Sequence, residues 1–257
     1  MVALPLEHPV EEPLVHVEGL KMAYGEKVVQ HDLNFDILPG EVLAIIGESG
    51  CGKSTLLRHL IGLQPPSAGR IFYGHDDLNQ VEGDALAKLR RAFCVSFQAG
   101  ALWSSMSVGE NVMLPLEIFG KLNDEDREKL AREKLTLVGL GDQFDVEPSA
   151  LSGGMKKRAA IARALALEPP LLYLDEPSAG LDPLTAAQLD HLILHLSEQG
   201  HTVVMVTHEL PSIFAVADRA LFLDAETHTM TALDAPETLR DHGPEKVQNF
   251  LRRGLPA

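Results

Sequence analysis

Short apolar runs divide most of the chain into alternating strands and helices. The runs at 42–46, 171–174 and 202–207 are apolar almost without interruption, which is typical of strands buried on both faces of a parallel sheet. Between the last two, the helix that begins at Asp182 places leucine and isoleucine at the i, i+3, i+4 and i+7 positions of an amphipathic helix. Buried strands that alternate with helices predict an α/β fold.

The elements outside these runs are predicted from weaker patterns. The segment 99–120 mixes small, apolar and proline residues, so we expect mainly loop there, with a short helix at 108–112. Asn123 caps a charged helix that ends before Gly139. The other expected elements are strands at 14–18, 69–74 and 93–97, one or two strands over 28–38, helices at 85–91 and 155–167, a hairpin of 219–224 with 229–233, and helical turns over 245–252.

Chain length and end composition set the expected domain organisation. At 257 residues the chain can bury a full core, and we expect one large domain over 14–253, with 1–13 and 254–257 as tails. No run approaches the roughly 18 apolar residues of a transmembrane helix, and the opening MVALPLEHPVEEP has neither a basic start nor an apolar core. We therefore expect a soluble protein, for which any membrane role needs a partner.

Charge and cysteine content narrow the partners and the compartment. The formal charge of −15 argues against nucleic acid or an anionic lipid surface as the main partner, because both are negatively charged. Cys51 and Cys94 form neither a disulfide framework nor a metal-ligand pair, so a reducing compartment, the cytoplasm, is expected.

The sequence GESGCGKST follows the first buried strand and precedes a helix with an apolar face. Its glycines lack a Cβ, so the backbone can curl and point successive N–H groups at a phosphate. Lys53 adds a positive charge for the β and γ phosphates, and Ser54 offers a hydroxyl to Mg²⁺. The predicted phosphate cradle consists of Gly47, Glu48, Ser49, Gly50, Cys51, Gly52, Lys53, Ser54 and Thr55.

Cys51 lies within this loop, at the N-terminus of a helix. That position predicts a lowered pKa of its thiol and ready alkylation unless nucleotide covers it. A small residue that fills a variable position of the loop is an equally good interpretation.

A second anion site is expected at Ser152, Gly153 and Gly154. They precede a helix that two prolines prevent from continuing, and a helix N-terminus with exposed N–H groups attracts anions. The basic residues at 156–158 add positive charge nearby. On its own, however, this pattern is most often a helix cap.

Polar residues follow three of the predicted strands. Asp175 and Glu176 end the run at 171–174, and ligands of open α/β sheets bind at that end of the strands. Adjacent residues alternate in direction, so one acid can serve Mg²⁺ and the other an attacking water. His208 follows the last buried strand at the same edge, and Gln98 ends the strand at 93–97.

Taken together, these motifs resemble those of the ATP-binding subunit of ABC transporters. GESGCGKST is similar to its Walker A motif, Gln98 to its Q-loop, LSGGM to its signature, LLYLDE to its Walker B motif, SAGLD to its D-loop and His208 to its switch histidine. The resemblance covers nearly the whole chain. It implies a P-loop NTPase fold with a RecA-like core, an antiparallel β subdomain and a helical subdomain at about 99–160.

The resemblance also implies how the chain binds Mg-ATP. Tyr24, which alone would be a packing or turn residue, stacks on adenine, while Lys53 and the loop amides hold the phosphates. Ser54, Gln98 and Asp175 serve Mg²⁺ directly or through water.

The remaining motif residues are implied to act in hydrolysis by a homodimer. Each ATP lies between the Walker A motif of one copy and the signature of the other, so Ser152, Gly153 and Gly154 bind the γ-phosphate across the dimer. Glu176 polarises the attacking water and His208 holds the γ-phosphate. The implied catalytic residues are Glu176, His208, Gln98 and Lys53.

Two segments, 97–117 and 151–169, resemble more narrowly the ATPase of Mla-type, MCE-linked phospholipid transporters of the Gram-negative envelope. Met155 stands where the wider family usually has glutamine. The narrower resemblance implies a peripheral protein on the cytoplasmic face of the inner membrane. Its implied partners are a membrane permease, an MCE-domain substrate-binding protein and a STAS-domain protein.

Three alternatives remain open. The first is that the chain energises an importer or exporter of another substrate. A soluble ABC ATPase of translation or DNA maintenance is disfavoured because the chain lacks a second cassette and a long coiled-coil insertion. A regulator that does not hydrolyse ATP is disfavoured because Glu176 and His208 are both present.

Overall fold

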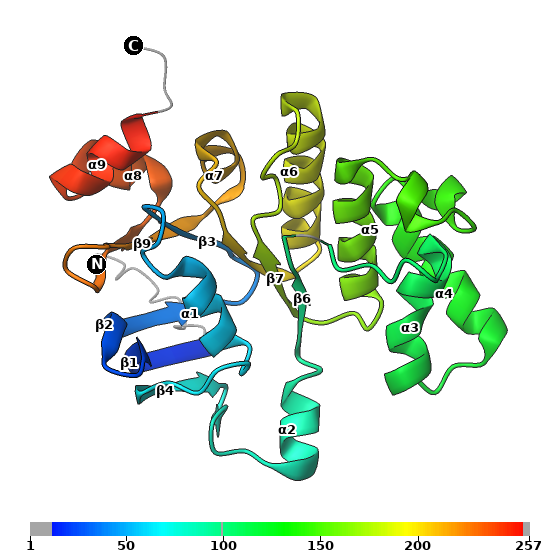
Figure 1. Cartoon of the computed structure of the whole chain (residues 1–257), viewed down its shortest axis with the longest axis horizontal. Helices are drawn as coiled ribbons and strands as arrows, with labels where there is room; N and C mark the ends of the chain where they lie inside the picture. Colours follow the sequence, from blue (N-terminus) through cyan, green and yellow to red (C-terminus); the bar gives the residue numbers. More distant parts are fainter. Residues whose placement is uncertain (1–11, 99, 254–257) are drawn as a thin grey trace, which may run out of the picture.

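The computed structural model describes residues 12–98 and 100–253, which form a central sheet with helices packed around it and a second sheet at one side (Figure 1). The predicted C-terminal tail, 254–257, lies outside the described residues, as does most of the predicted N-terminal tail. The expected domain limits of 14–253 therefore stay a prediction. Within the described ranges, no helix has both the length and the apolar character needed to cross a bilayer.

The N-terminal sheet is antiparallel and has the strand order β2-β1-β4-β5. Its strands are β1 (Val15–Tyr24), β2 (Lys27–Ile37), β4 (Ala68–Tyr73) and β5 (Asp76–Asp77). β1 continues six residues past the predicted end at 18. Where one or two strands were predicted over 28–38, the structure has a single strand, β2.

The central sheet has the order β10-β9-β3-β8-β7-β6 and is parallel except for β10, which pairs antiparallel with β9 at one edge. Every residue of β3 is buried, because alternate side chains enter two different cores on opposite faces of the sheet. This arrangement confirms the α/β fold. The strands are β3 (Val42–Gly47), β6 (Phe93–Ser96), β7 (Leu171–Asp175), β8 (Thr202–Val206), β9 (Arg219–Leu223) and β10 (Met230–Asp234).

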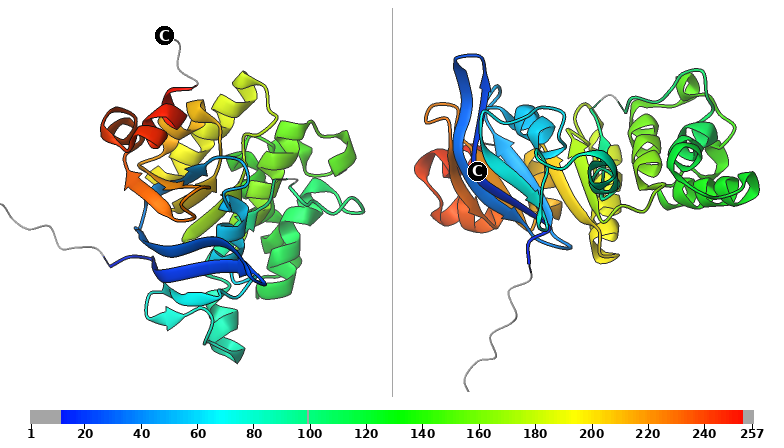
Figure 2. Two further views of the ribbon diagram at one scale, coloured as in Figure 1. Left: turned by 60° about the vertical axis from the view of Figure 1, so that its left-hand side comes forward. Right: turned by 90° about the horizontal axis from the view of Figure 1, so that it is seen from below.

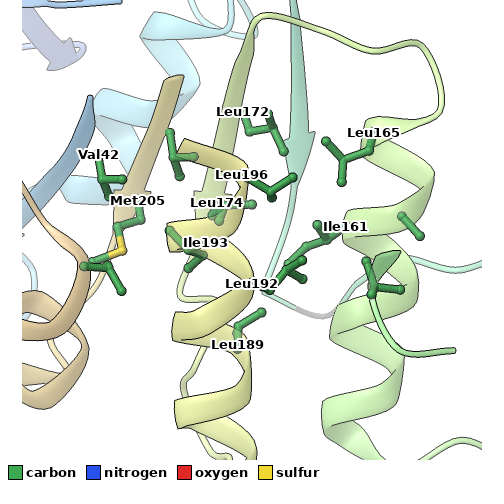
Figure 3. Packing of buried hydrophobic residues seen from close by; sticks show 14 of the residues in the cluster. Val42, Ile161, Leu165, Leu172, Leu174, Leu189, Leu192, Ile193, Leu196 and Met205 are labelled. Atoms are coloured by element: carbon green, nitrogen blue, oxygen red, sulfur yellow. The ribbon is translucent and has the colours of Figure 1, made fainter. Parts of the chain in front are cut away.

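Helices cover both faces of the central sheet. Figure 3 shows α6 packed through Leu189, Ile193 and Leu196 between the strands and α5, as its periodicity predicts. In Figure 2, α3 and α4 gather to one side of the molecule. The helices are α1 (Lys53–Leu60), α2 (Gly83–Leu89), α3 (Val108–Phe119), α4 (Asp124–Leu137), α5 (Gly153–Leu165), α6 (Pro183–Glu198), α7 (Leu210–Val216), α8 (Pro236–His242) and α9 (Glu245–Arg252), with 3₁₀ turns at Gly141–Gln143 and Pro148–Ala150.

Helix α3 is longer than the predicted 108–112. Ser107 and Glu110 form a capping box at its start, and the helix then continues through Pro115. A proline inside a helix removes one backbone donor. Val112 and Leu116 are nevertheless buried in the main core, and their packing holds the helix together across the proline. The prediction of a short helix is therefore wrong.

Candidate nucleotide-binding site

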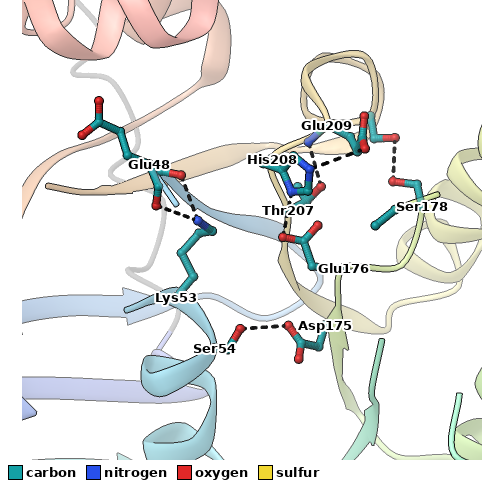
Figure 4. A network of polar contacts seen from close by, with 12 residues as sticks. Glu48, Lys53, Ser54, Asp175, Glu176, Ser178, Thr207, His208 and Glu209 are labelled. Atoms are coloured by element: carbon teal, nitrogen blue, oxygen red, sulfur yellow. Dashed lines mark hydrogen bonds and ion pairs between the residues drawn. The ribbon is translucent and has the colours of Figure 1, made fainter. Parts of the chain in front are cut away.

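The loop between β3 and α1 wraps around the ammonium group of Lys53. Lys53 Nζ donates to the carbonyl oxygens of Gly47 at 2.9 Å and Glu48 at 3.0 Å (Figure 4). Gly47 has φ +145°, and a Cβ there would overlap the carbonyl oxygen of Leu223. Helix α1 starts after Gly52, which has no side chain to cap it. The first N–H groups of α1 are thus available to an anion.

Buried Gln30 of β2 holds the back of this loop. Its side-chain amide donates to the carbonyl oxygens of Cys51 at 2.7 Å and Asp224 at 2.9 Å, so it joins the loop to the end of β9. Sequence reasoning missed Gln30 because a glutamine within a strand is usually a solvated residue. Gln30 lies out of phase with the alternating apolar residues Leu33, Phe35 and Ile37 of β2, so the local pattern does not indicate that it is buried.

A cavity of about 850 Å³ lies over the loop and is lined by most of the predicted site residues. They include Tyr24, Gln98, Glu176 and His208 together with every loop residue except Cys51. The predicted site residues that do not line the cavity are Cys51, Asp175, Ser152, Gly153 and Gly154. The lining residues that sequence reasoning missed are Lys27, Val28, Val29, His228, Phe250 and Arg253.

Asp175 and Glu176 face different partners at the end of β7. Ser54 Oγ donates to Asp175 Oδ1 at 3.4 Å, and burial and the neighbouring Glu176 charge raise the pKa of Asp175. Glu176 adopts φ +49°, donates its N–H to the carbonyl oxygen of Val206 at 2.8 Å, and has its Oε1 2.9 Å from His208 Nδ1. Its buried Oε2 has no hydrogen-bond partner among the described residues.

These oxygen donors fit Mg²⁺. The hydroxyl of Ser54 and the carboxylate of Asp175 are the hard ligands that Mg²⁺ prefers, and both lie beside the phosphate cradle. Burial, and after it the charge of Glu176, raises the pKa of Asp175, and a cation bound beside the carboxylate would favour its ionised form.

Ser152 caps helix α5, whose start carries the second predicted anion site. Ser152 Oγ accepts from the N–H of Met155 at 3.2 Å, and the helix runs over Gly153–Leu165, two residues earlier at each end than predicted. Lys157 Nζ donates to the carbonyl oxygens of Glu176 at 3.0 Å and Ala179 at 2.6 Å. This basic side chain, which was predicted to add charge near the helix start, thus ties α5 to the segment after β7.

We expect Gly154→Ala to destabilise the protein by about 1–3 kcal/mol, because the new Cβ would overlap Thr185 Cγ2 of α6. Gly153→Ala is the matched control: a Cβ there meets no described atom within 4 Å, so the free energy of unfolding should change by less than about 1 kcal/mol. Urea unfolding measures both. Adding Thr185→Ser, which removes Cγ2, should restore the stability of Gly154→Ala, and equal stability of the two alanine variants would contradict the packing argument.

The predicted lowering of the Cys51 pKa is wrong. The side chain is 2% exposed, and burial raises the pKa of its thiol, an effect that the nearby charge of Lys53 offsets only in part. Desolvation of the thiolate therefore outweighs the helix N-terminus.

Alkylation of Cys51 should accordingly be slow at pH 7, about tenfold or more below the rate of a free thiol, and should accelerate as the pH rises past 9. Mass spectrometry of iodoacetamide labelling in a Cys94→Ala background measures this rate. Labelling of the folded, nucleotide-free protein at the rate of a free thiol would contradict it.

Curated relatives of the chain are transport ATP-binding proteins. One is the probable ribonucleotide transport ATP-binding protein mkl of Mycobacterium leprae, 39% identical over 205 residues, which are 79% of this chain and 59% of the relative. Another is the methionine import ATP-binding protein MetN of Xanthomonas euvesicatoria pv. vesicatoria, 44% identical over 217 residues, 82% of this chain and 64% of the relative. The chain thus spans about 59% to 64% of the length of these relatives.

Solved structures of ATP-binding cassettes share the fold of the chain. A dimeric post-hydrolysis state of the ATP-binding cassette MJ0796 bound to ADP and Pi has a TM-score of 0.77 and 33% identity over 86% of this chain and 98% of that one. CbiO1 from Clostridium perfringens, part of the ABC transporter complex cbiONQ, has a TM-score of 0.82 and 29% identity over 96% of this chain and 97% of that one. Residues 30–179 match the family model described as ABC transporter. The chain therefore belongs to the ABC transporter family.

Proposed function

We propose that this chain is the ATP-hydrolysing subunit of a phospholipid transporter. It would act as a homodimer on separate membrane permease subunits, at the cytoplasmic face of the inner membrane. An MCE-domain substrate-binding protein and a STAS-domain protein would complete the assembly. The observation that carries the ATPase assignment and the homodimer is that the implied catalytic residues all line the nucleotide cavity, whereas the signature residues 152–154 do not.

The missing part supports a homodimer. Among the described residues, Ser152, Gly153 and Gly154 do not line the cavity, although they form the start of a helix suited to an anion. A second copy of the chain could bring its own helix start to the open side of this cavity. The similar cassette MJ0796 is dimeric in two solved structures, which favours this arrangement.

Hydrolysis would then rest on the placement of charges around the γ-phosphate. Lys53 would exchange its two backbone carbonyls for phosphate oxygens, and the orphaned Oε2 of Glu176 would accept a proton from the attacking water. His208 is exposed beyond Glu176 and would orient that carboxylate or bind the γ-phosphate. Mg²⁺ bound at Ser54 and Asp175 would neutralise phosphate charge.

An apolar surface on the helical side supports contact with a permease. Trp103, Ile118 and Phe119 are exposed, and a groove of about 410 Å³ lies beside Phe119, between α2, β6, α3 and α5. Arg163 in this groove donates to the carbonyl oxygens of Gly100 and Ala101, shortly after Gln98. An amphipathic permease helix with acidic side chains would fit this groove, which contains the guanidinium group of Arg163. Through Arg163, the bound helix would respond to structural changes in the segment after Gln98.

The cargo is assigned from the resemblance of segments 97–117 and 151–169 to the phospholipid-transport ATPases. The second candidate is an importer of a small polar solute, which the names of the methionine and ribonucleotide relatives favour.

Purification of the tagged chain from detergent-solubilised membranes separates these candidates. We expect a permease, an MCE-domain protein and phospholipid identified by mass spectrometry, and in proteoliposomes we expect ATP-dependent movement of a fluorescent phospholipid. A Glu176→Gln complex serves as the inactive control. Recovery of a solute permease whose ATPase responds to methionine would favour the second candidate, and recovery of ribosomes or DNA would contradict both.

A further inference from the structure

Helix α9, close to the C-terminal end of the described chain, borders the nucleotide cavity. Its Phe250 and Arg253, the residue after the helix, line the cavity. Val247 and Leu251 are fully buried, and Phe250 packs edge-on against Phe222 of β9 with ring centroids 5.3 Å apart. These contacts fix the position of α9 relative to the central sheet.

Lys246 of α9 lies among three carboxylates. Its Nζ is 2.8 Å from Asp224 Oδ1, 3.3 Å from Glu226 Oε1 and 3.6 Å from Glu48 Oε2. Glu48 belongs to the phosphate-binding loop, and Figure 4 shows its carboxylate directed away from the ammonium group of Lys53. Lys246, from the C-terminal part of the sequence, thus forms an ion pair with Glu48.

The same cluster reaches the phosphate-binding loop at a second point. Asp224 has a nearly buried side chain whose Oδ1 also accepts the N–H of Glu226 at 2.7 Å, and its carbonyl oxygen accepts from Gln30. Gln30 in turn donates to the carbonyl oxygen of Cys51. Contacts therefore run from α9 to both Glu48 and Cys51 of the loop.

A carboxylate in a phosphate-binding loop repels the ligand unless a cation compensates its charge. We propose that Lys246 is a positioning residue of the nucleotide site: it neutralises Glu48 and holds that carboxylate away from the phosphates. Hydrogen bonding to Asp224 raises the pKa of Lys246, and a lysine is already charged at neutral pH. The proposal concerns ATP binding and does not depend on the cargo.

Substitution of Lys246 in the full chain, with and without Glu48→Gln, tests this role. Lys246→Met should raise the Kd and KM for Mg-ATP about 5- to 10-fold, the effect of one uncompensated charge near a partly exposed site, and leave kcat within about twofold. In the Glu48→Gln background the same substitution should change Kd by less than about twofold, because Glu48 is the one carboxylate of the three that belongs to the phosphate-binding loop. Lys246→Arg should retain the parent Kd.

Two further variants keep the test decisive. Lys134→Met removes a lysine whose Nζ is 2.7 Å from Glu168, outside the nucleotide cavity, and should leave Kd unchanged. Glu48→Gln alone should bind Mg-ATP at least as tightly as the parent, which can be measured even if Lys246→Met fails to fold. Equal effects of Lys246→Met in both backgrounds, an unchanged Kd in the single variant, or weaker binding by Glu48→Gln would each overturn the proposal.

Discussion

Glu176→Gln should reduce ATP hydrolysis about 10²- to 10⁴-fold, the usual contribution of a general base, while Mg-ATP binding is retained. The physical reason lies in the surroundings of the carboxylate. One oxygen faces His208 Nδ1 at 2.9 Å, and the other is buried without a partner among the described residues. Glutamine keeps the shape and the contact with His208, but an amide cannot accept the proton of the attacking water.

The measurement combines single-turnover hydrolysis with size-exclusion chromatography in Mg-ATP. With hydrolysis blocked, the variant should accumulate as a closed dimer, whereas the parent cycles between states. Glu209→Gln is the matched control: Glu209 Oε1 lies 3.7 Å from the other ring nitrogen of His208, but Glu209 does not line the nucleotide cavity. Turnover by Glu176→Gln at the control rate would rule out Glu176 as the base.

Lys53→Ala should weaken Mg-ATP binding about 100-fold and abolish turnover at ordinary ATP concentrations, because it removes charge-assisted hydrogen bonds worth about 1.5–3 kcal/mol. The substitution also leaves the carbonyl groups of Gly47 and Glu48 without the donor they have in the free protein. We therefore expect Lys53→Ala to lower both the order of the phosphate-binding loop and its affinity for phosphate.

Equilibrium binding of a fluorescent ATP analogue, with a coupled ATPase assay, measures the effect. Lys134→Ala serves as the control because it removes an equal charge outside the cavity. Normal turnover by Lys53→Ala would refute the role of the whole loop.

Local patterns sufficed to predict the buried strands of the central sheet and the phosphate-binding loop, whereas Tyr24 and Gln98 were assigned to the site from the resemblance to the family. The buried run at 42–46 and the glycine-rich turn after it determine their own conformation, because their burial and backbone geometry depend on near neighbours. The carboxyl ends of parallel strands share one edge, so Glu176 and His208 meet even though 32 residues separate them.

Features that depend on distant packing were not predictable in this way. The segment 99–120 lacks a clear helical period, and only the burial of Val112 and Leu116 against other helices shows that α3 continues past residue 112. The position of Cys51 at a helix N-terminus predicts a reactive thiol, and only the structure shows that the thiol is buried. The pairing of Lys246 with Glu48 joins positions 198 residues apart, and no local pattern reports it.

The link from Lys157 to the carbonyl groups of Glu176 and Ala179 has a consequence for a two-ATP assembly. In the proposed dimer, the start of α5 closes over the partner's ATP, whereas Glu176 acts on the ATP of its own chain. Because Lys157 links α5 to the segment that carries Glu176, ATP cleavage at one site would also move the α5 start that covers the second ATP. The two sites would then hydrolyse ATP cooperatively, and the rate of hydrolysis would depend sigmoidally on ATP concentration.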